Sequence, residues 1–135
     1  GAIDRLPRLY AIQALNAAPY YAAWSSESDE PIEIKATYTI ADGIASSRPI
    51  RLREVFLALH ETNGDIVAVT ELEIKNALKA LCKKGLFVEP TSAAGAAGLQ
   101  KLIEDKSITP EERVVLILTG SGLKAVETIV GVLNK

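Results

Sequence analysis

A run of five branched apolar residues, Val114 to Leu118, constrains the fold of this chain more than any other feature. Thr-Gly-Ser-Gly follows at residues 119–122, and a helix-like pattern comes next. An apolar run that ends in a glycine-rich turn is typical of a buried strand whose turn opens a helix. In open α/β sheets, ligands bind at the carboxyl ends of such strands. The hydroxyl of Thr119 is therefore a candidate ligand contact.

The composition predicts one globular domain, or part of a larger one. The chain has 135 residues, of which 48% are apolar and 24% charged, with a formal charge of -2, so it can build a core. No basic stretch is long enough to follow a phosphate backbone, and we expect no nucleic-acid binding. No apolar run reaches the roughly 20 residues of a membrane helix, and we expect no membrane association.

The single cysteine, Cys82, lies within an apolar helix pattern. It cannot form an internal disulfide, which fits a reducing, cytoplasmic location, and we expect its thiol to lie in or near the core. A first residue other than Met leads us to expect a processed or truncated chain.

Predicted strands and helices alternate along the chain, and each predicted strand is followed by a helix. The predicted strands span residues 9–14, 66–69, 86–88 and 114–118, and the predicted helices span residues 16–24, 38–45, 51–61, 71–84, 92–105 and 124–133. This alternation predicts an α/β fold, a three-layer α/β/α arrangement around a small, mostly parallel sheet. Residues 1–135 are interpreted as a single, partial α/β domain.

The end signals of several helices are readable in the sequence. Thr70 and Glu73 have the spacing of a capping box, and Asn63-Gly64 and Gly85 are helix stops. Thr91 or Ser92 is expected to cap the following helix. The first turns of that helix are almost entirely Ala and Gly. Close packing of the helix on a sheet is the favoured explanation, and contact with a flat ligand is the alternative.

The Thr-Gly-Ser-Gly segment has two interpretations. It holds a ligand through the Thr119 hydroxyl and free backbone N–H groups, or it is a plain turn in which Gly relieves crowding. Spacing alone favours the plain turn, because neither a dinucleotide-binding glycine motif nor a P-loop is present. His60 has no Cys, His or Asp cluster around it in the sequence, so we expect no metal site. Trp24, Tyr20 and Tyr21 are interpreted as core anchors.

Four segments, taken in order, resemble the threonine synthase branch of the fold-type II (tryptophan synthase β-like) enzymes, which depend on pyridoxal phosphate (PLP). They are LPRLYAIQA at 6–14, TIADGI at 39–44, GLFVEPTSAA at 85–94 and LTGSGLK at 118–124. The resemblance covers essentially the whole chain. It corresponds only to the C-terminal part of such an enzyme, well under half of its length.

This resemblance implies a PLP-dependent lyase of threonine biosynthesis that converts O-phosphohomoserine and water to threonine and phosphate. It implies a cytoplasmic homo-oligomer, a dimer. The Thr119 hydroxyl would bind the pyridine nitrogen beside Gly120, Gly43 would border the cofactor, and Glu89 would shape the pocket wall. A neutral hydroxyl leaves the ring nitrogen less protonated than an aspartate would, which suits elimination and replacement better than transamination.

Two departures limit what the resemblance implies. Ala125 stands where family members usually carry an acid. The family's Schiff-base lysine lies in a Ser-Phe-Lys-Asp-like segment and its phosphate loop is rich in Gly and Asn, and this chain contains neither. We therefore expect no catalytic residue here, no covalently bound PLP, and no activity of the chain alone.

Two other identities stay open. The first is another fold-type II enzyme, such as an amino-acid dehydratase or a cysteine synthase, which usually carries a Ser-Gly-Gly-Asn-like turn at the Thr119 position. Gly122-Leu123-Lys124 argues against it. The second is a non-catalytic binding or assembly module that kept the half-fold. An upstream coding sequence with a lysine segment and a phosphate loop would exclude that module.

Overall fold

A two-stranded parallel sheet lies at the centre of the computed structural model, which describes residues 3–48 and 50–134. Strand β1 (Tyr10–Ala14) pairs with β2 (Asp65–Val69) in a register that sets Tyr10 opposite Asp65. Both strands lie where the sequence predicts them.

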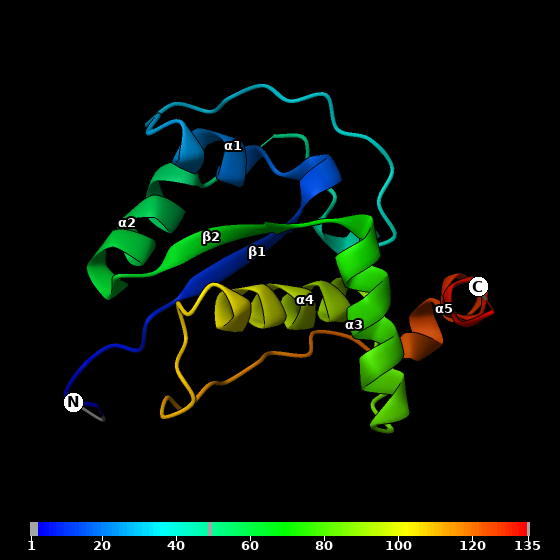
Figure 1. The fold of residues 1–135 in the computed structure, drawn as a ribbon. Helices are drawn as coiled ribbons and strands as arrows, with labels where there is room; N and C mark the ends of the chain where they lie inside the picture. Colours follow the sequence, from blue (N-terminus) through cyan, green and yellow to red (C-terminus); the bar gives the residue numbers. More distant parts are fainter. Residues whose placement is uncertain (1–2, 49, 135) are drawn as a thin grey trace.

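Helices cover both faces of this sheet, as Figure 1 shows. The helices α1 (Pro19–Ser25) and α2 (Leu52–Thr62) lie on one face, and α4 (Pro90–Glu104) lies on the other. The helix α3 (Glu71–Lys83) crosses one end of α4 and also contacts α5 (Val126–Leu133). The predicted three-layer α/β/α arrangement is confirmed. In the described parts of the chain, no helix combines the length and apolarity needed to cross a membrane.

Three short 3-10 helices link these elements: η1 (Leu15–Ala17), η2 (Asp42–Ile44) and η3 (Gly122–Lys124). The predicted capping box of Thr70 and Glu73 and the predicted stops at Asn63-Gly64 and Gly85 are confirmed. The Glu73 N–H donates to Thr70 Oγ1 at 3.3 Å and the Thr70 N–H donates to Glu73 Oε2 at 2.6 Å, which completes the capping box. Asn63 ends α2 and Gly85 follows α3, each with a positive φ, 51° and 79°.

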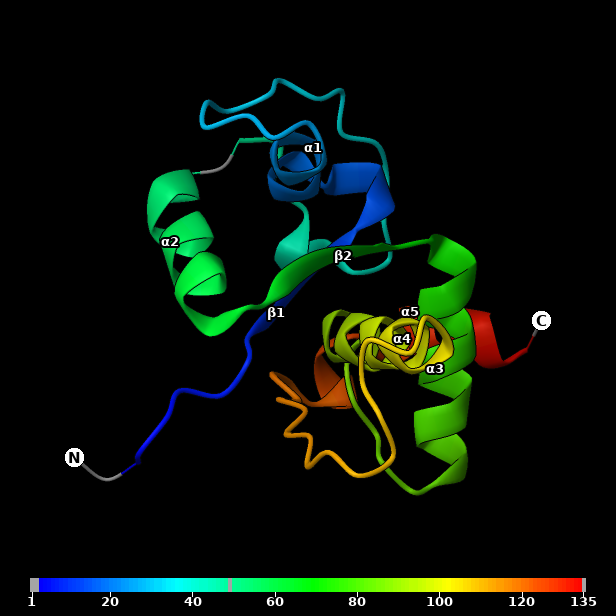
Figure 2. The same cartoon turned by 60° about the vertical axis from the view of Figure 1, so that its left-hand side comes forward.

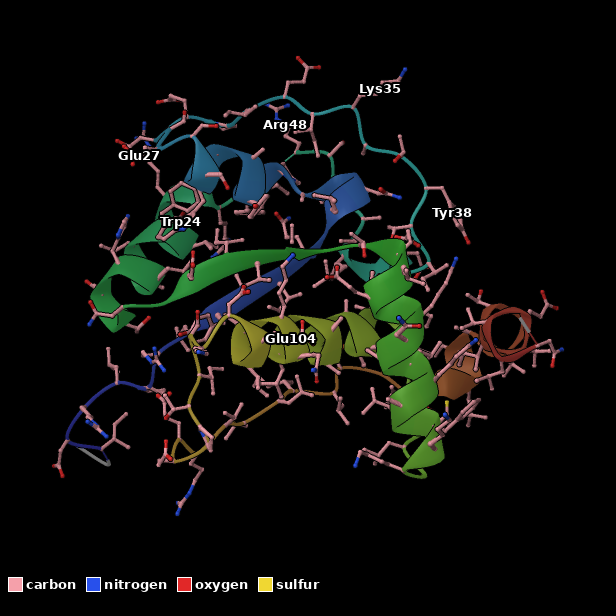
Figure 3. The ribbon with its side chains drawn as sticks, in the orientation of Figure 1. Trp24, Glu27, Lys35, Tyr38, Arg48 and Glu104 are labelled. Carbon is pink, nitrogen blue, oxygen red and sulfur yellow. The ribbon has the colours of Figure 1, made fainter. Side chains whose placement is uncertain are left out.

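Two apolar clusters stabilise the layers. The larger one joins the sheet to α3, α4 and α5, and Cys82 is partly buried against it. The smaller one lies beneath α1 and α2. There the Trp24 ring lies 4.9 Å from the ring of Phe56, and Figure 3 places Trp24 between the two helices. Tyr20 and Tyr21 pack against the same cluster, which confirms the three aromatic residues as core anchors.

The small-residue helix lies very close to the sheet. A Cβ atom at Gly98 of α4 would fall 2.3 Å from Ile12 Cδ1 of β1. Real Cβ atoms do not approach other atoms so closely, so only glycine fits this contact without displacing Ile12. Close helix–sheet packing is therefore the reason for the small residue at this position.

The prediction of a buried strand at 114–118 is wrong. Among residues 3–48 and 50–134 this segment has no strand partner, and Val115 is 83% and Ile117 74% exposed. Leu116 is half-buried, with its Cδ1 3.1 Å from the Cβ position at Gly95 of α4. Figure 1 shows the segment running along α4 on the side opposite the sheet, and in Figure 2, where α4 is seen nearly end-on, α3 lies on the other side of α4 from the segment. A strand needs a hydrogen-bonded neighbour as well as apolar side chains, and no described segment supplies one.

Four other predicted elements differ from the structure. In place of a strand at 86–88, only Val88 forms a single antiparallel bridge, to Ser121. The predicted helix at 38–45 shrinks to η2, and Tyr38 lies outside it, 77% exposed and pointing outward in Figure 3. The backbone N–H of Ile40 donates to Glu71 Oε2, so this amide does not enter a helix. The predicted helices at 16–24 and 124–133 begin later than predicted, at Pro19 and Val126.

Candidate functional site

Two segments that carry the resemblance lie side by side in the structure. The Glu89 N–H donates to Gly120 O at 3.1 Å, and the Gly122 N–H donates to Phe87 O at 3.0 Å. Together with the Val88–Ser121 bridge, these bonds hold residues 87–89 antiparallel to residues 120–122. The turn that carries Thr119 is therefore fixed against the beginning of α4.

The hydroxyl of Ser92 joins this turn to α4. Ser92 is 1% exposed. The Gly120 N–H donates to Ser92 Oγ at 3.0 Å, and Ser92 Oγ lies 3.2 Å from Thr119 Oγ1. Ser92 Oγ also lies 3.4 Å from Gly120 O. These contacts connect residues 27 and 28 positions apart in the chain.

The expectation that Thr91 or Ser92 caps α4 is wrong. Glu89 is the N-cap residue, it makes no side-chain cap bond, and Pro90 occupies the first turn. Proline has no backbone N–H, so the helix start has one fewer amide to satisfy. The hydroxyls of Thr91 and Ser92 are free to bind other segments.

Glu89 lies on the exposed side of Thr119. The Thr119 hydroxyl donates to Glu89 Oε1 at 3.4 Å. A Cβ at residue 120 would lie 2.1 Å from the same oxygen, so the carboxylate occupies the space that a side chain there would need. Gly120 is thus required for this placement of Glu89.

Gly43 is attached to the same end of α4 through Thr91. The Gly43 N–H donates to Thr91 Oγ1 at 3.2 Å, and a Cβ at Gly43 would lie 2.8 Å from that oxygen. The structure therefore brings all four predicted site residues to the first turn of α4. They are Gly43, Glu89, Thr119 and Gly120.

The backbone amides that the ligand-binding interpretation of the turn required to be free are occupied. The Gly120 N–H binds Ser92, the Gly122 N–H binds Phe87 O, and the Leu123 N–H binds Ser121 Oγ at 3.3 Å. These amides therefore do not form an anion site. The polar group that Thr119 offers to a ligand is its hydroxyl.

Two contacts around this site are not predicted by the sequence. The sequence position of Ser92 predicts a cap, and its contact with Thr119 spans too many residues for a local pattern to reveal. The sequence predicts no particular contact for Glu71, yet its Oε2 accepts the Ile40 N–H at 3.0 Å and its Oε1 is buried without a partner among the described residues. This carboxylate fixes the segment that leads to Gly43.

Metal-binding side chains are dispersed. Within residues 3–48 and 50–134, no three His, Cys, Asp or Glu residues gather as metal ligands. His60 is exposed near the end of α2, with its ring 4.7 Å from that of Trp24.

The cluster fits the nitrogen end of a pyridine ring. Thr119 supplies an exposed neutral hydroxyl that is fixed in place from its buried side by Ser92. Such a hydroxyl can donate to an unprotonated ring nitrogen. In the described ranges, no lysine binds Thr119. The ammonium of Lys101, a lysine of α4, donates to the backbone of β2, to Ala68 O at 3.2 Å. These residues thus fit one end of PLP, and the covalent end has no candidate in the cluster.

Comparison with known proteins identifies the family of the chain. The family model described as "Pyridoxal-phosphate dependent enzyme" matches residues 2–120. Threonine synthase of Methanocaldococcus jannaschii is 42% identical over 125 residues, which cover 92% of this chain and 31% of that protein. The chain thus spans about a third of the length of this curated relative.

Solved structures share the fold. Serine racemase of Dictyostelium discoideum matches with a TM-score of 0.62 and 26% identity over 84% of this chain and 34% of its own. A fungal L-serine ammonia-lyase from Rhizomucor miehei matches with a TM-score of 0.75 over 93% of this chain and 40% of its own, and at 17% identity it supports the fold alone. These structures match the predicted partial fold of the fold-type II enzymes. The family model covers most of the chain. The chain belongs to the family of pyridoxal-phosphate-dependent enzymes.

Proposed function

We propose that this chain is the C-terminal part of a threonine synthase and that Thr119 holds the ring nitrogen of PLP. The observation that carries the proposal is the hydroxyl of Thr119, the second residue of the LTGSGLK segment, which is fixed between Ser92 and Glu89. The 42% identity to an archaeal threonine synthase supports it. The proposed substrate is O-phosphohomoserine, and the products are threonine and phosphate.

Bound PLP supplies an electron sink for carbanions formed on the substrate. The residues of this chain position its ring. Thr119 donates to the ring nitrogen, and Gly120 leaves room for the Glu89 carboxylate beside it. Glu89 and the small residues of α4 form a wall of the pocket, and Gly43 borders the cofactor. As a neutral partner, Thr119 leaves the ring nitrogen unprotonated, which tempers the electron sink.

The rest of the active site is proposed to come from polypeptide beyond these 135 residues. The lysine segment and the phosphate loop are not in the sequence. We therefore propose that the chain alone is inactive and that the complete enzyme is a cytoplasmic homodimer.

The other identities have less support. A dehydratase or cysteine synthase would carry a different turn at Thr119, whereas Gly122-Leu123-Lys124 continues the threonine synthase pattern. A non-catalytic module would have no use for a fixed hydroxyl at this turn.

A chimaeric enzyme tests the proposal. This chain replaces the matching 125-residue segment of the Methanocaldococcus jannaschii threonine synthase, and phosphate release from O-phosphohomoserine is measured. We expect an active chimaera, a loss of about 10- to 100-fold in kcat/KM for Thr119→Val, and a smaller loss for Thr119→Ser. A folded, PLP-loaded chimaera that releases no phosphate contradicts the activity. An unaffected Thr119→Val variant contradicts the assigned site.

A further inference from the structure

We infer that Ser92 is a positioning residue that makes Thr119 a hydrogen-bond donor toward the ring nitrogen of PLP. The inference rests on the proposed function, because it concerns the same site. Ser92 is buried and Thr119 is exposed. Ser92 therefore acts on a ligand through Thr119.

The hydrogen bonds of Ser92 determine where its proton lies. A serine hydroxyl has one proton to donate and two lone pairs that accept. The Gly120 N–H takes one lone pair at 3.0 Å. The proton then has two acceptors, Thr119 Oγ1 at 3.2 Å and Gly120 O at 3.4 Å. Gly120 O already accepts the Glu89 N–H at 3.1 Å, so the shorter bond to Thr119 is favoured.

This bond directs the proton of Thr119. When Thr119 Oγ1 accepts from Ser92, its own proton points elsewhere. Among the described residues, the acceptor left for this proton is Glu89 Oε1, at a long 3.4 Å. A ring nitrogen that enters the site can replace this long bond with a shorter one. Thr119 then donates, and the site selects a ring nitrogen that carries no proton.

Charged groups near Thr119 also influence the ring. Among the described residues, Glu89 is the charged side chain in polar contact with Thr119. Its negative charge favours a protonated ring, opposite to the effect of Ser92. Removing Ser92 lets the Thr119 hydroxyl turn and accept from a protonated ring. Substituting Ser92 and substituting Glu89 should therefore change the protonation of the ring nitrogen in opposite directions.

The ring nitrogen of bound PLP reports these effects directly. The chimaera is loaded with ¹⁵N-ring-labelled PLP, and the ¹⁵N shift is followed with pH. We expect an unprotonated ring in the parent, a shift toward the pyridinium position in Ser92→Ala, and a partial return in Ser92→Cys, which keeps a weak donor. Glu89→Gln should move the ¹⁵N shift further toward the value of the unprotonated ring. PLP binding should weaken about fivefold in Ser92→Ala.

A matched control separates this effect from a loss of stability. Thr62 is also buried, and its hydroxyl also accepts a backbone N–H, from Leu9 at 3.3 Å. Thr62→Val removes that buried hydroxyl from the opposite layer of the fold. It should lower stability and leave the ring shift unchanged.

A second measurement uses the 135-residue chain without cofactor. Three-bond couplings report the χ1 angle of Thr119. This angle should be fixed in the parent and averaged over rotamers in Ser92→Ala. The control Thr62→Val should give the same couplings as the parent. If Ser92→Ala leaves the Thr119 coupling unchanged, or gives the same ¹⁵N ring shift as the parent, the inference about Ser92 is overturned and the proposed function is unaffected. A parent chimaera that binds no PLP contradicts the proposed function, and the couplings in the free chain still decide whether Ser92 positions Thr119.

Discussion

Gly98 and Ile12 fix the distance between α4 and the sheet. The Cβ position of Gly98 lies 2.3, 2.8 and 3.1 Å from three atoms of the Ile12 side chain, not from its tip alone. An added methyl group therefore has to displace the whole side chain of Ile12. The proximity of α4 to β1 is set by this pair.

Gly98→Ala should lower the free energy of unfolding. Overpacking costs about 1–3 kcal/mol, which exceeds the gain of about 1 kcal/mol from replacing a helical Gly with Ala. Denaturant titration measures the difference. Gly131→Ala in α5 is the matched control, because nothing lies within 4 Å of its Cβ position, and it should stabilise by up to about 1 kcal/mol. Equal stabilisation by both variants would show that the Ile12 contact is not tight.

Stability should fall in acid in part through Glu73. Partial burial raises the pKa of its carboxyl, but hydrogen bonds from the Thr70 N–H and hydroxyl and the nearby Lys101 ammonium outweigh burial and lower the pKa below 4.5. A carboxyl with a lowered pKa stabilises the fold above its unfolded-state pKa, and this contribution is lost as pH falls through the folded-state pKa.

Glu73→Gln should therefore flatten the dependence of unfolding free energy on pH below about 4.5. Thr70→Ala should cost about 1 kcal/mol near neutral pH through the lost cap. Thermal unfolding at several pH values measures both effects. An unchanged acid slope in Glu73→Gln would assign the acid sensitivity to other carboxyls.

The exposed apolar segment 114–118 should promote self-association of this chain. Val115 and Ile117 are 83% and 74% exposed, and exposed apolar patches bind partners or hydrophobic dyes. We expect dye binding and concentration-dependent sedimentation, both reduced by Val115→Lys with Ile117→Lys. Leu116→Ala, which removes the contact with Gly95, should reduce stability instead. A strictly monomeric parent that binds no dye would contradict this prediction.

PLP added to the isolated chain should label no single lysine. None of the lysines lies in the family's Ser-Phe-Lys-Asp-like context. After borohydride reduction, peptide mapping should find scattered, substoichiometric labelling. Stoichiometric labelling of one lysine would mean that the chain carries its own covalent PLP site.

Local patterns predicted the elements whose signals lie within a few residues. The capping box of Thr70 and Glu73 and the stop at Gly85 mark α3 correctly, because caps satisfy amides of the same helix. The short, mainly apolar segments of β1 and β2 are also predicted correctly as strands. The resemblance also implies roles for Gly43, Glu89, Thr119 and Gly120, which the fold brings to the first turn of α4.

Contacts between distant segments decided the rest. The residues 114–118 have strand-forming side chains, but a strand exists only when a neighbour accepts its backbone hydrogen bonds, and that neighbour is not within reach of any local pattern. Likewise, Ser92 has the sequence position of a cap, whereas its hydroxyl binds the Thr119–Gly120 turn 27 and 28 residues away. Helix periodicity and the capping box of α3 depend on residues close together in the chain, so the sequence alone predicts them. Strand pairing and the direction of a buried hydroxyl depend on which segments meet, and tertiary packing alone brings those segments together.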